Sequence, residues 1–199
     1  LIIIDMQKDF LPGGALAVDK GDEIIAPIEG FARKFEHVVL TADWHPRGHI
    51  SFASSYEGLQ PNHSVRTDYG EQQLWPEHCI QNTPGAEFGV DIPHAGLVLR
   101  KGTRPHLDSY SAFLENDHMT PTGLAGYLRE RQLTRLFLCG LAFDYCVGSS
   151  AVDATKMGFE VLVLEDLSRA IAPESTATMR ERFAKLSIQC VHSDILMKK

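Results

Sequence analysis

The chain has 199 residues, of which 44% are hydrophobic, and its 19 Lys and Arg against 26 Asp and Glu give a formal net charge of −7. A chain of this length can bury about 70% of the surface that its unfolded form would expose, so it needs no disulfide or structural metal to fold. An acidic chain without a basic run is a poor partner for nucleic acid or for an anionic membrane, and we exclude both.

Short runs that are apolar at every position alternate with amphipathic stretches along the chain. The former predict strands buried on both faces of a parallel sheet, and the latter predict the helices that cover it. In chain order, the expected elements are a strand at Leu1–Ile4, a helix from a capping Asp22 to about Phe35, strands at Val38–Leu40 and Leu97–Leu99, a helix from Thr120 or Thr122 to about Leu133, a strand at Leu136–Cys139, a helix from about Tyr145 to Met157, a strand at Val161–Leu164, a helix from Pro173 to about Leu186 and a weaker strand at Ile188–Val191.

This alternation predicts an α/β fold: one domain over residues 1–199, with a doubly wound, mostly parallel six-stranded sheet and helices on both faces. The segment at about 43–93 interrupts it, because it has no sustained period and is rich in His, Pro, Gly, Ser and Asn. Connections this long are uncommon in compact domains unless they are functional or disordered, and the aromatic residues Trp44, Trp75 and Phe88 argue against disorder. We therefore expect an ordered excursion that helps to build a site.

Cysteine usage indicates the compartment. The four cysteines are too sparse for a secreted disulfide scaffold, and none stands in a CxxC pair. The apolar run Leu1–Ile4 is too short for a signal peptide or a membrane span, and no later run approaches about 20 apolar residues. We expect a soluble, cytoplasmic protein with reduced thiols, in which Cys139 and Cys190 are structural.

Residues that follow the predicted strands are informative, because ligands of α/β sheets bind beyond the carboxyl ends of the strands. Asp5 follows the first strand, Asp43 the second, Lys101 the third, and a strand-to-helix turn leading to Cys146 the fourth. Backbone N–H groups at a helix entrance and a cation such as Lys101 would lower the pKa of the Cys146 thiol. A free cysteine is as often a small buried hydrophobe, so its position alone leaves both interpretations open.

A second group of residues lies within the excursion. Asp43 and His45 are two residues apart at a strand end and point to the same side, and His78 can complete a set of ligands for one metal ion. One carboxylate and two imidazoles suit Zn²⁺, Mn²⁺ or Fe²⁺, of which we favour zinc, and leave positions for water or substrate. His49 is either a fourth metal ligand or a hydrogen-bond donor to one of the ligands.

Five segments carry a combined pattern: Asp5-Met-Gln-Lys-Asp-Phe10, Asp43-Trp-His-Pro, Trp75-Pro-Glu-His-Cys, Lys101-Gly and Gly140-Leu-Ala-Phe-Asp-Tyr-Cys146. Together they resemble the nicotinamidase/pyrazinamidase family of the isochorismatase-like cysteine hydrolases, in order along essentially the whole chain. The resemblance implies the isochorismatase-like fold and hydrolysis of nicotinamide to nicotinate and ammonia through a thioester, in NAD salvage. It also implies pyrazinamide as a further substrate.

The resemblance assigns roles to individual residues. Cys146 would be the nucleophile, Asp5 its general base, and Lys101 the group that holds the thiolate and orients the acid. The oxyanion would bind the backbone N–H groups of Ala142 and Cys146, after a cis peptide bond. One divalent metal would be held by Asp43, His45 and His78, with His49 as an additional candidate. The substrate pocket would be lined by Phe10, Leu16, Trp75, Tyr110, Leu141 and Tyr145.

Two other functions stay open at this stage. One is another isochorismatase-like amidohydrolase, acting on an N-carbamoyl or ureido substrate, although such enzymes generally lack the His45 and His78 pair. The other is a catalytically dead metal-binding module, which would be expected to have lost a triad or metal position. A dinucleotide-binding domain fails because the first strand is not followed by GxGxxG. The sequence does not determine the oligomeric state and is compatible with a homo-oligomer.

Overall fold

A computed structural model describes residues 1–196 of the chain. Its centre is a sheet of six strands in the order β5-β2-β1-β6-β7-β8, in which all neighbouring strands are parallel. The strands are β1 (Ile2–Ile4), β2 (Val39–Asp43), β5 (Leu97–Lys101), β6 (Arg135–Leu141), β7 (Glu160–Arg169) and β8 (Gln189–Val191). Each predicted apolar run forms a strand, and the predicted α/β fold class is confirmed.

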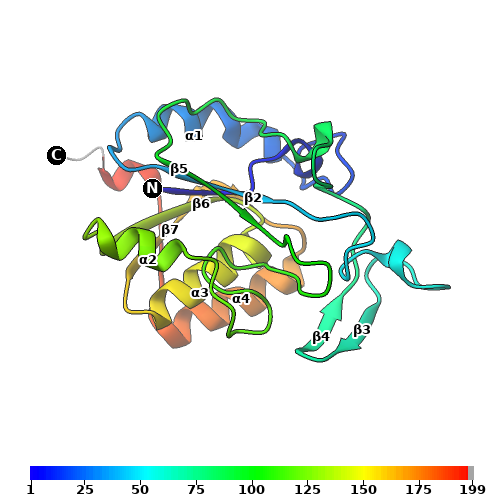
Figure 1. Cartoon of the computed structure of the whole chain (residues 1–199). Helices are drawn as coiled ribbons and strands as arrows, with labels where there is room; N and C mark the ends of the chain where they lie inside the picture. The colour runs from blue at the N-terminus through cyan, green and yellow to red at the C-terminus, as the bar shows by residue number, and fades with distance from the viewer. Residues whose placement is uncertain (197–199) are drawn as a thin grey trace.

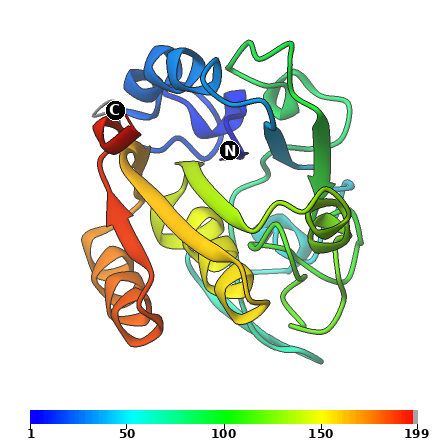
Figure 2. The same ribbon diagram turned by 90° about the vertical axis from the view of Figure 1, so that its left-hand side faces the viewer.

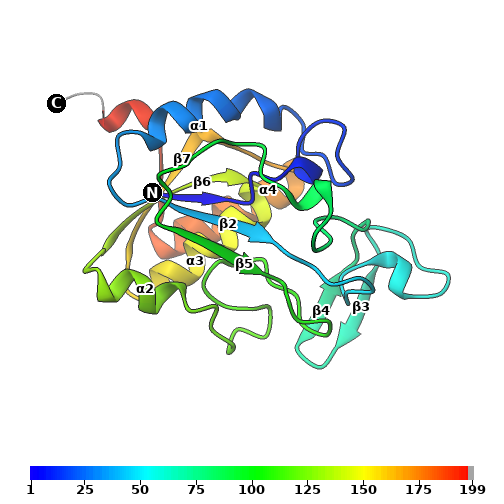
Figure 3. The same cartoon turned by 45° about the horizontal axis from the view of Figure 1, so that its top comes forward.

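Helices cover both faces of this sheet (Figures 1 and 3). One face packs against α1 (Ile25–Ala32), and the other packs against α2 (Leu124–Glu130), α3 (Gly148–Lys156) and α4 (Pro173–Leu186). Alternate residues of the first strand enter different cores, because successive side chains of a strand point to opposite faces. Within residues 1–196, no helix combines the length and apolar character that crossing a bilayer requires.

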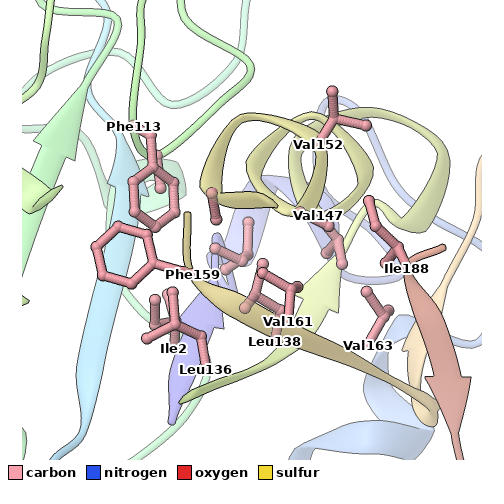
Figure 4. Packing of buried hydrophobic residues seen from close by; sticks show 14 of the residues in the cluster. Ile2, Phe113, Leu136, Leu138, Val147, Val152, Phe159, Val161, Val163 and Ile188 are labelled. Atoms are coloured by element: carbon pink, nitrogen blue, oxygen red, sulfur yellow. The ribbon is translucent and has the colours of Figure 1, made fainter. Parts of the chain in front are cut away.

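The larger core lies between the sheet and helices α2, α3 and α4 (Figure 4; Figure 2 gives a view turned by 90°). Strand residues such as Leu138 and Val163 are fully buried there beneath Val152 of α3. At one end the rings of Phe113 and Phe159 lie 5.8 Å apart. Because Phe113 belongs to the loop that follows β5, this contact anchors a segment that borders the site described below.

Helix starts differ from the sequence prediction in three places. One is α2, which begins at Leu124 after Gly123 and not at Thr120 or Thr122. Residues Gly21–Ile24 form a 3₁₀ turn, and α1 begins after Ile24 without a side-chain cap, so the prediction that Asp22 caps this helix is wrong. Before α3, residues Phe143–Val147 form a π turn. The last helix spans Pro173–Leu186, as predicted.

The excursion between β2 and β5 is ordered, as expected, and contains elements that the sequence analysis missed. An antiparallel hairpin of β3 (Ser64–Thr67) and β4 (Gly70–Gln73) stands away from the main sheet (Figure 1). Isolated bridges pair His45 with Ile80, and Phe52 with Trp75. These bridges join the two ends of the excursion and bring the region of residue 78 beside the end of β2.

Gly140 lies near the end of β6, and its close approach to β1 can be tested by substitution. Gly140 has a φ of +114°, and a Cβ added there would lie 2.1 Å from the backbone oxygen of Ile4. We expect Gly140→Ala to lower the free energy of unfolding by about 2–4 kcal/mol, as measured by urea denaturation. In α2, a Cβ added at Gly126 meets nothing within 4 Å, so Gly126→Ala should raise stability by about 0.5–1 kcal/mol. Equal effects of the two substitutions would contradict this account.

Candidate functional site

The ammonium group of Lys101 lies at the centre of the site, at the end of β5. Its side chain is fully buried, and Nζ lies 2.9 Å from Asp5 Oδ2 and 2.5 Å from Asp43 Oδ1. Nζ also donates to the backbone oxygen of Ser109 at 2.8 Å and lies 3.4 Å from Cys146 Sγ. A buried charge requires such compensation, because its removal from water is costly.

The parallel sheet explains why these residues meet. Asp43 and Lys101 are directly paired in the register of β2 and β5. Asp5 follows β1, which lies between β2 and β6, and Cys146 lies shortly after β6. Four side chains distant in sequence therefore gather at the carboxyl edge of four adjacent strands.

The Asp5 carboxylate is completely buried. Its Oδ1 accepts a hydrogen bond from Thr41 Oγ1 at 2.6 Å, and a carboxylate oxygen lies within 4.8 Å of Cys146 Sγ. Oδ2 forms the ion pair with Lys101 but accepts no hydrogen bond from any described residue. Burial raises the pKa of Asp5, and Lys101 offsets part of that effect. Asp5 is therefore a buried base with an available oxygen near the thiol.

Cys146 lies in the π turn that leads into α3, with its side chain buried. Burial raises the pKa of this thiol well above its ordinary value; Lys101 opposes that effect, and Asp5 adds to it. The predicted lowering of the Cys146 pKa is therefore wrong, because desolvation outweighs the neighbouring cation. The thiol is protonated until a base takes its proton.

Asp43, His45 and His78 converge beside Lys101, with one ligand atom of each within 4.8 Å of the others. The Nε2 atoms of His45 and His78 lie 3.7 and 3.9 Å from Asp43 Oδ2. On the far side of each ring, Nδ1 contacts a backbone oxygen, that of Gly102 at 2.9 Å and that of Pro76 at 2.8 Å. Since a carbonyl only accepts, Nδ1 carries the proton and each ring presents a bare Nε2, as in histidine metal sites. These residues fit a divalent metal.

Charges and burial in this cluster favour the metal-binding forms of Asp43 and His78, but not that of His45. Burial opposes ionisation of Asp43, but Lys101 and then His45 outweigh it and lower the pKa of that carboxyl. Burial, followed by the effect of His45, lowers the pKa of His78 to about 4. For His45, burial is outweighed by Asp43, which raises the pKa of the imidazole, so metal binding at His45 competes with a proton.

His49 lies beside the cluster, with its ring stacked on that of His45 at a centroid distance of 4.2 Å. Its Nδ1 lies 2.7 Å from Ser51 Oγ, and its buried Nε2 has no hydrogen-bond partner among the described residues. His49 groups with His45 and Asp108, and not with the other two predicted ligands. The structure therefore places His49 next to the set of three predicted ligands.

A pocket opens over these groups. Its lining comprises Phe10, Leu16, Asp43, His45, Trp75, His78, Asp108, Tyr110, Ala142, Tyr145, Cys146 and Ile171. Aromatic rings form one wall: Trp75 Nε1 donates to Tyr110 Oη at 3.0 Å, and the Trp75 and Tyr145 rings are nearly perpendicular at 4.9 Å. A flat aromatic ligand suits such a wall.

Leu141 does not line this pocket, in contrast to the prediction. Its side chain is fully buried in the core on the α1 face of the sheet. The peptide bond that joins it to Ala142 is cis, as the resemblance implies. Ala142 and Cys146, the two residues with backbone N–H groups expected to bind the oxyanion, both border the pocket.

Two polar residues of the site were missed in the sequence analysis. Gln7 is fully buried; its Nε2 donates to the backbone oxygens of Asp43 and Ala86, and its Oε1 accepts from the Asp43 N–H at 2.8 Å. Asp108 is buried at the pocket and accepts from Gln72 Nε2 at 2.9 Å. A glutamine just beyond an apolar strand was a usable signal, whereas Asp108 lies in a loop without any pattern.

Comparison with known proteins agrees with this geometry. The isochorismatase domain family matches residues 1–193. A nicotinamidase of Acinetobacter baylyi is 47% identical over 173 residues, which cover 86% of this chain and 81% of that protein.

Two solved structures have the same fold. One, an Acinetobacter baumanii nicotinamidase/pyrazinamidase, has a TM-score of 0.96 at 46% identity and covers 98% of this chain and 96% of its own. Another, the pyrazinamidase of Pyrococcus horikoshii in complex with zinc, has a TM-score of 0.79 at 39% identity, with coverages of 96% and 97%. The chain therefore belongs to the isochorismatase family, within its nicotinamidase branch.

Proposed function

We propose that this protein hydrolyses nicotinamide to nicotinate and ammonia, with Cys146 as nucleophile. The proposal rests on the position of Lys101 Nζ beneath an aromatic pocket, where it lies 2.9 Å from Asp5 Oδ2 and 3.4 Å from Cys146 Sγ. The similarity to nicotinamidases supports the choice of substrate. Pyrazinamide differs from nicotinamide by one ring nitrogen in place of a CH group, so the same pocket should accept it.

In the first half-reaction, Asp5 takes the proton of the Cys146 thiol, and Sγ forms a bond to the carboxamide carbon. Backbone N–H groups of Ala142 and Cys146 receive the oxyanion, and each such donor is typically worth about 10²–10³ in rate. Asp5, now protonated, passes its proton to the amide nitrogen. The C–N bond breaks, and ammonia leaves behind a thioester on Cys146.

In the second half-reaction, Asp5 accepts a proton from a water molecule that attacks the thioester carbonyl. The C–S bond breaks, Asp5 returns its proton to the sulfur and so restores the thiol, and the product acid loses its remaining proton to solvent and leaves as nicotinate. Lys101 stays charged throughout, because the buried Asp43 and Asp5 raise its pKa well above the ordinary value against the effect of burial. A fixed ammonium of this kind stabilises negative charge whether it lies on Asp5 or on the sulfur.

Asp43, His45 and His78 would hold one divalent metal ion, for which we propose zinc because of the mixed carboxylate and imidazole ligands. When bound, the metal supplies a Lewis-acid contact for the ring nitrogen of the substrate. The neighbouring His49 nitrogen, which lacks a partner among the described residues, would help to orient groups at that site. Trp75 and Tyr145 would hold the ring by aromatic contacts.

The cellular setting that we propose is the cytoplasm, where the four free thiols would stay reduced. Nicotinate formation there serves NAD salvage. We also propose that residues 1–199 act as one domain; residues 197–199 lie outside the described part of the chain.

The nucleophile can be tested directly. Cys146→Ala removes the proposed nucleophilic sulfur, so ammonia release from nicotinamide should fall by at least about 10³-fold. Cys190→Ala serves as the matched control, because this half-buried thiol in β8 does not line the pocket. Metal content should be near one per chain in both variants. Loss of activity in the control alone, or full activity of Cys146→Ala, would refute the proposed mechanism.

The role of Asp5 as base predicts a specific pH effect. The Thr41 hydroxyl stabilises the Asp5 carboxylate and so lowers its pKa. Thr41→Val removes this bond and raises the Asp5 pKa further, so the acid limb of the kcat/KM profile should move to higher pH. Thr41→Ser keeps the hydroxyl and should restore the original limb. A uniform loss of rate at every pH would show that Thr41 has only a structural role.

The hydrogen bonds between the Gln7 side chain and the Asp43 backbone, here called the backbone clamp, predict an effect on metal binding. Gln7→Glu cannot donate to the backbone oxygen of Asp43, which Gln7 contacts at 2.8 Å. Loss of a residue that orients a ligand typically weakens metal affinity about 10–100-fold, measurable by competition with a chromophoric chelator for zinc. Gln60→Glu makes the same chemical change at an exposed position and should bind zinc like the unmodified chain. Equal zinc affinity in both variants would rule out the clamp.

A further inference from the structure

A second cavity lies next to the active-site pocket and has no part in the reaction proposed above. Its volume is about 320 Å³, and it opens to solvent between the β3–β4 hairpin, the loop after β5, α3 and α4. Among the described residues, the two cavities share only Tyr110 as a lining side chain. Its size is in the range of small-molecule sites.

Asp153 of α3 is the most unusual residue of this cavity. Only 5% of it is exposed, and it lines the cavity wall. Within residues 1–196, no side chain or N–H group forms a hydrogen bond or ion pair with its carboxylate. Its oxygens still reach the water of the cavity, so water alone compensates this mostly buried charge, and a cation that entered the cavity would find a carboxylate without a partner.

Glu115, in the loop after β5, is a second carboxylate with an unused oxygen. It is 7% exposed, and its Oε1 accepts from Arg104 Nε at 3.0 Å. The buried Oε2 has no hydrogen-bond partner in the described part of the chain. Burial raises the pKa of Glu115, and Arg104 offsets part of this effect. Two nearly buried carboxylates therefore line one cavity with unmet hydrogen-bonding capacity.

The rest of the lining indicates the chemistry of an occupant. Glu71 adds a third carboxylate, against the positive charges of Arg182 in the lining and of Arg104, which already pairs with Glu115. Tyr69 and Leu114 supply aromatic and apolar surface. Guanidinium and ammonium groups pair with carboxylates and also lie well against aromatic rings. Within residues 1–196, the sets of three side chains that could chelate a metal all lie elsewhere. The lining thus favours an organic cation over a bare metal ion.

We propose that this cavity binds a small organic cation whose guanidinium or ammonium group pairs with Asp153 and Glu115 and whose carbon chain lies along Tyr69 and Leu114. This site is separate from the amidase centre, and the proposal does not depend on the amidase activity. Retention of unpaired buried carboxylates at a cost in stability is typical of binding sites.

Agmatine, which carries both a guanidinium and an ammonium group on a butyl chain, is a suitable probe for the full chain, with N-butylurea as its neutral control. Isothermal titration should show agmatine binding at one site and none for the urea, and the melting temperature should rise with agmatine concentration. Cys146→Ala should bind agmatine as tightly as the unmodified chain, so failure of the amidase proposal would not affect this result.

Asp153→Asn keeps the shape of the side chain and removes its charge. We expect it to weaken agmatine binding at least tenfold and to raise the melting temperature without ligand, because the unpaired charge is gone. Glu57→Gln removes a charge from an exposed acid outside the cavity and should change neither quantity.

Three results would overturn the proposal. They are the absence of agmatine binding at millimolar concentration, equal agmatine affinity in Asp153→Asn and Glu57→Gln, and a lower melting temperature of ligand-free Asp153→Asn. The last result would mean that Asp153 stabilises the fold through its charge.

Discussion

The buried ammonium group of Lys101 ties together the parts of the site. Burial lowers the pKa of a lysine, but Asp43 and then Asp5 outweigh it here and keep the group charged. These two carboxylates belong to different parts of the site, since Asp43 faces the imidazoles of the metal cluster and Asp5 faces the thiol. A single positive charge thereby holds the thiol side and the metal side in a fixed relation, and neither can lose its carboxylate without exposing an uncompensated charge.

The long connections on either side of β5 follow from the need to bury that charge. β5 is the edge strand of the sheet, so the residue at its end would otherwise meet solvent. The excursion between β2 and β5 begins with the Trp44 N–H, which donates to the Lys101 backbone oxygen, and the loop after β5 supplies the Ser109 oxygen to Nζ. Segments that look irregular in the sequence therefore shield the reacting groups from water, where charge–charge contacts would be weaker.

Sequence patterns correctly predicted the features that depend on local burial, which are the strands and the sheet edge at which they end. Runs such as Val161–Leu164 are apolar on both faces and mark buried strands, and the residues that follow these runs must share one edge of a parallel sheet. The β3–β4 hairpin escaped prediction because its residues are polar and largely exposed. The pKa of Cys146 and the position of Leu141 were misjudged because both depend on packing between distant segments, which helix position and neighbouring residues in sequence do not reveal.

The raised pKa values of Cys146 and Asp5 have a mechanistic consequence. The proton rests on sulfur in the free enzyme, so nucleophilic attack requires its transfer to Asp5, and a base of raised pKa accepts it more readily. During transfer, negative charge moves from the carboxylate to Sγ. Because Lys101 Nζ lies 2.9 Å from the first and 3.4 Å from the second, the same ammonium stabilises both states without rearrangement of solvent. Burial thus raises the pKa of the thiol. The buried Lys101 ammonium group then stabilises the thiolate that forms at the moment of attack.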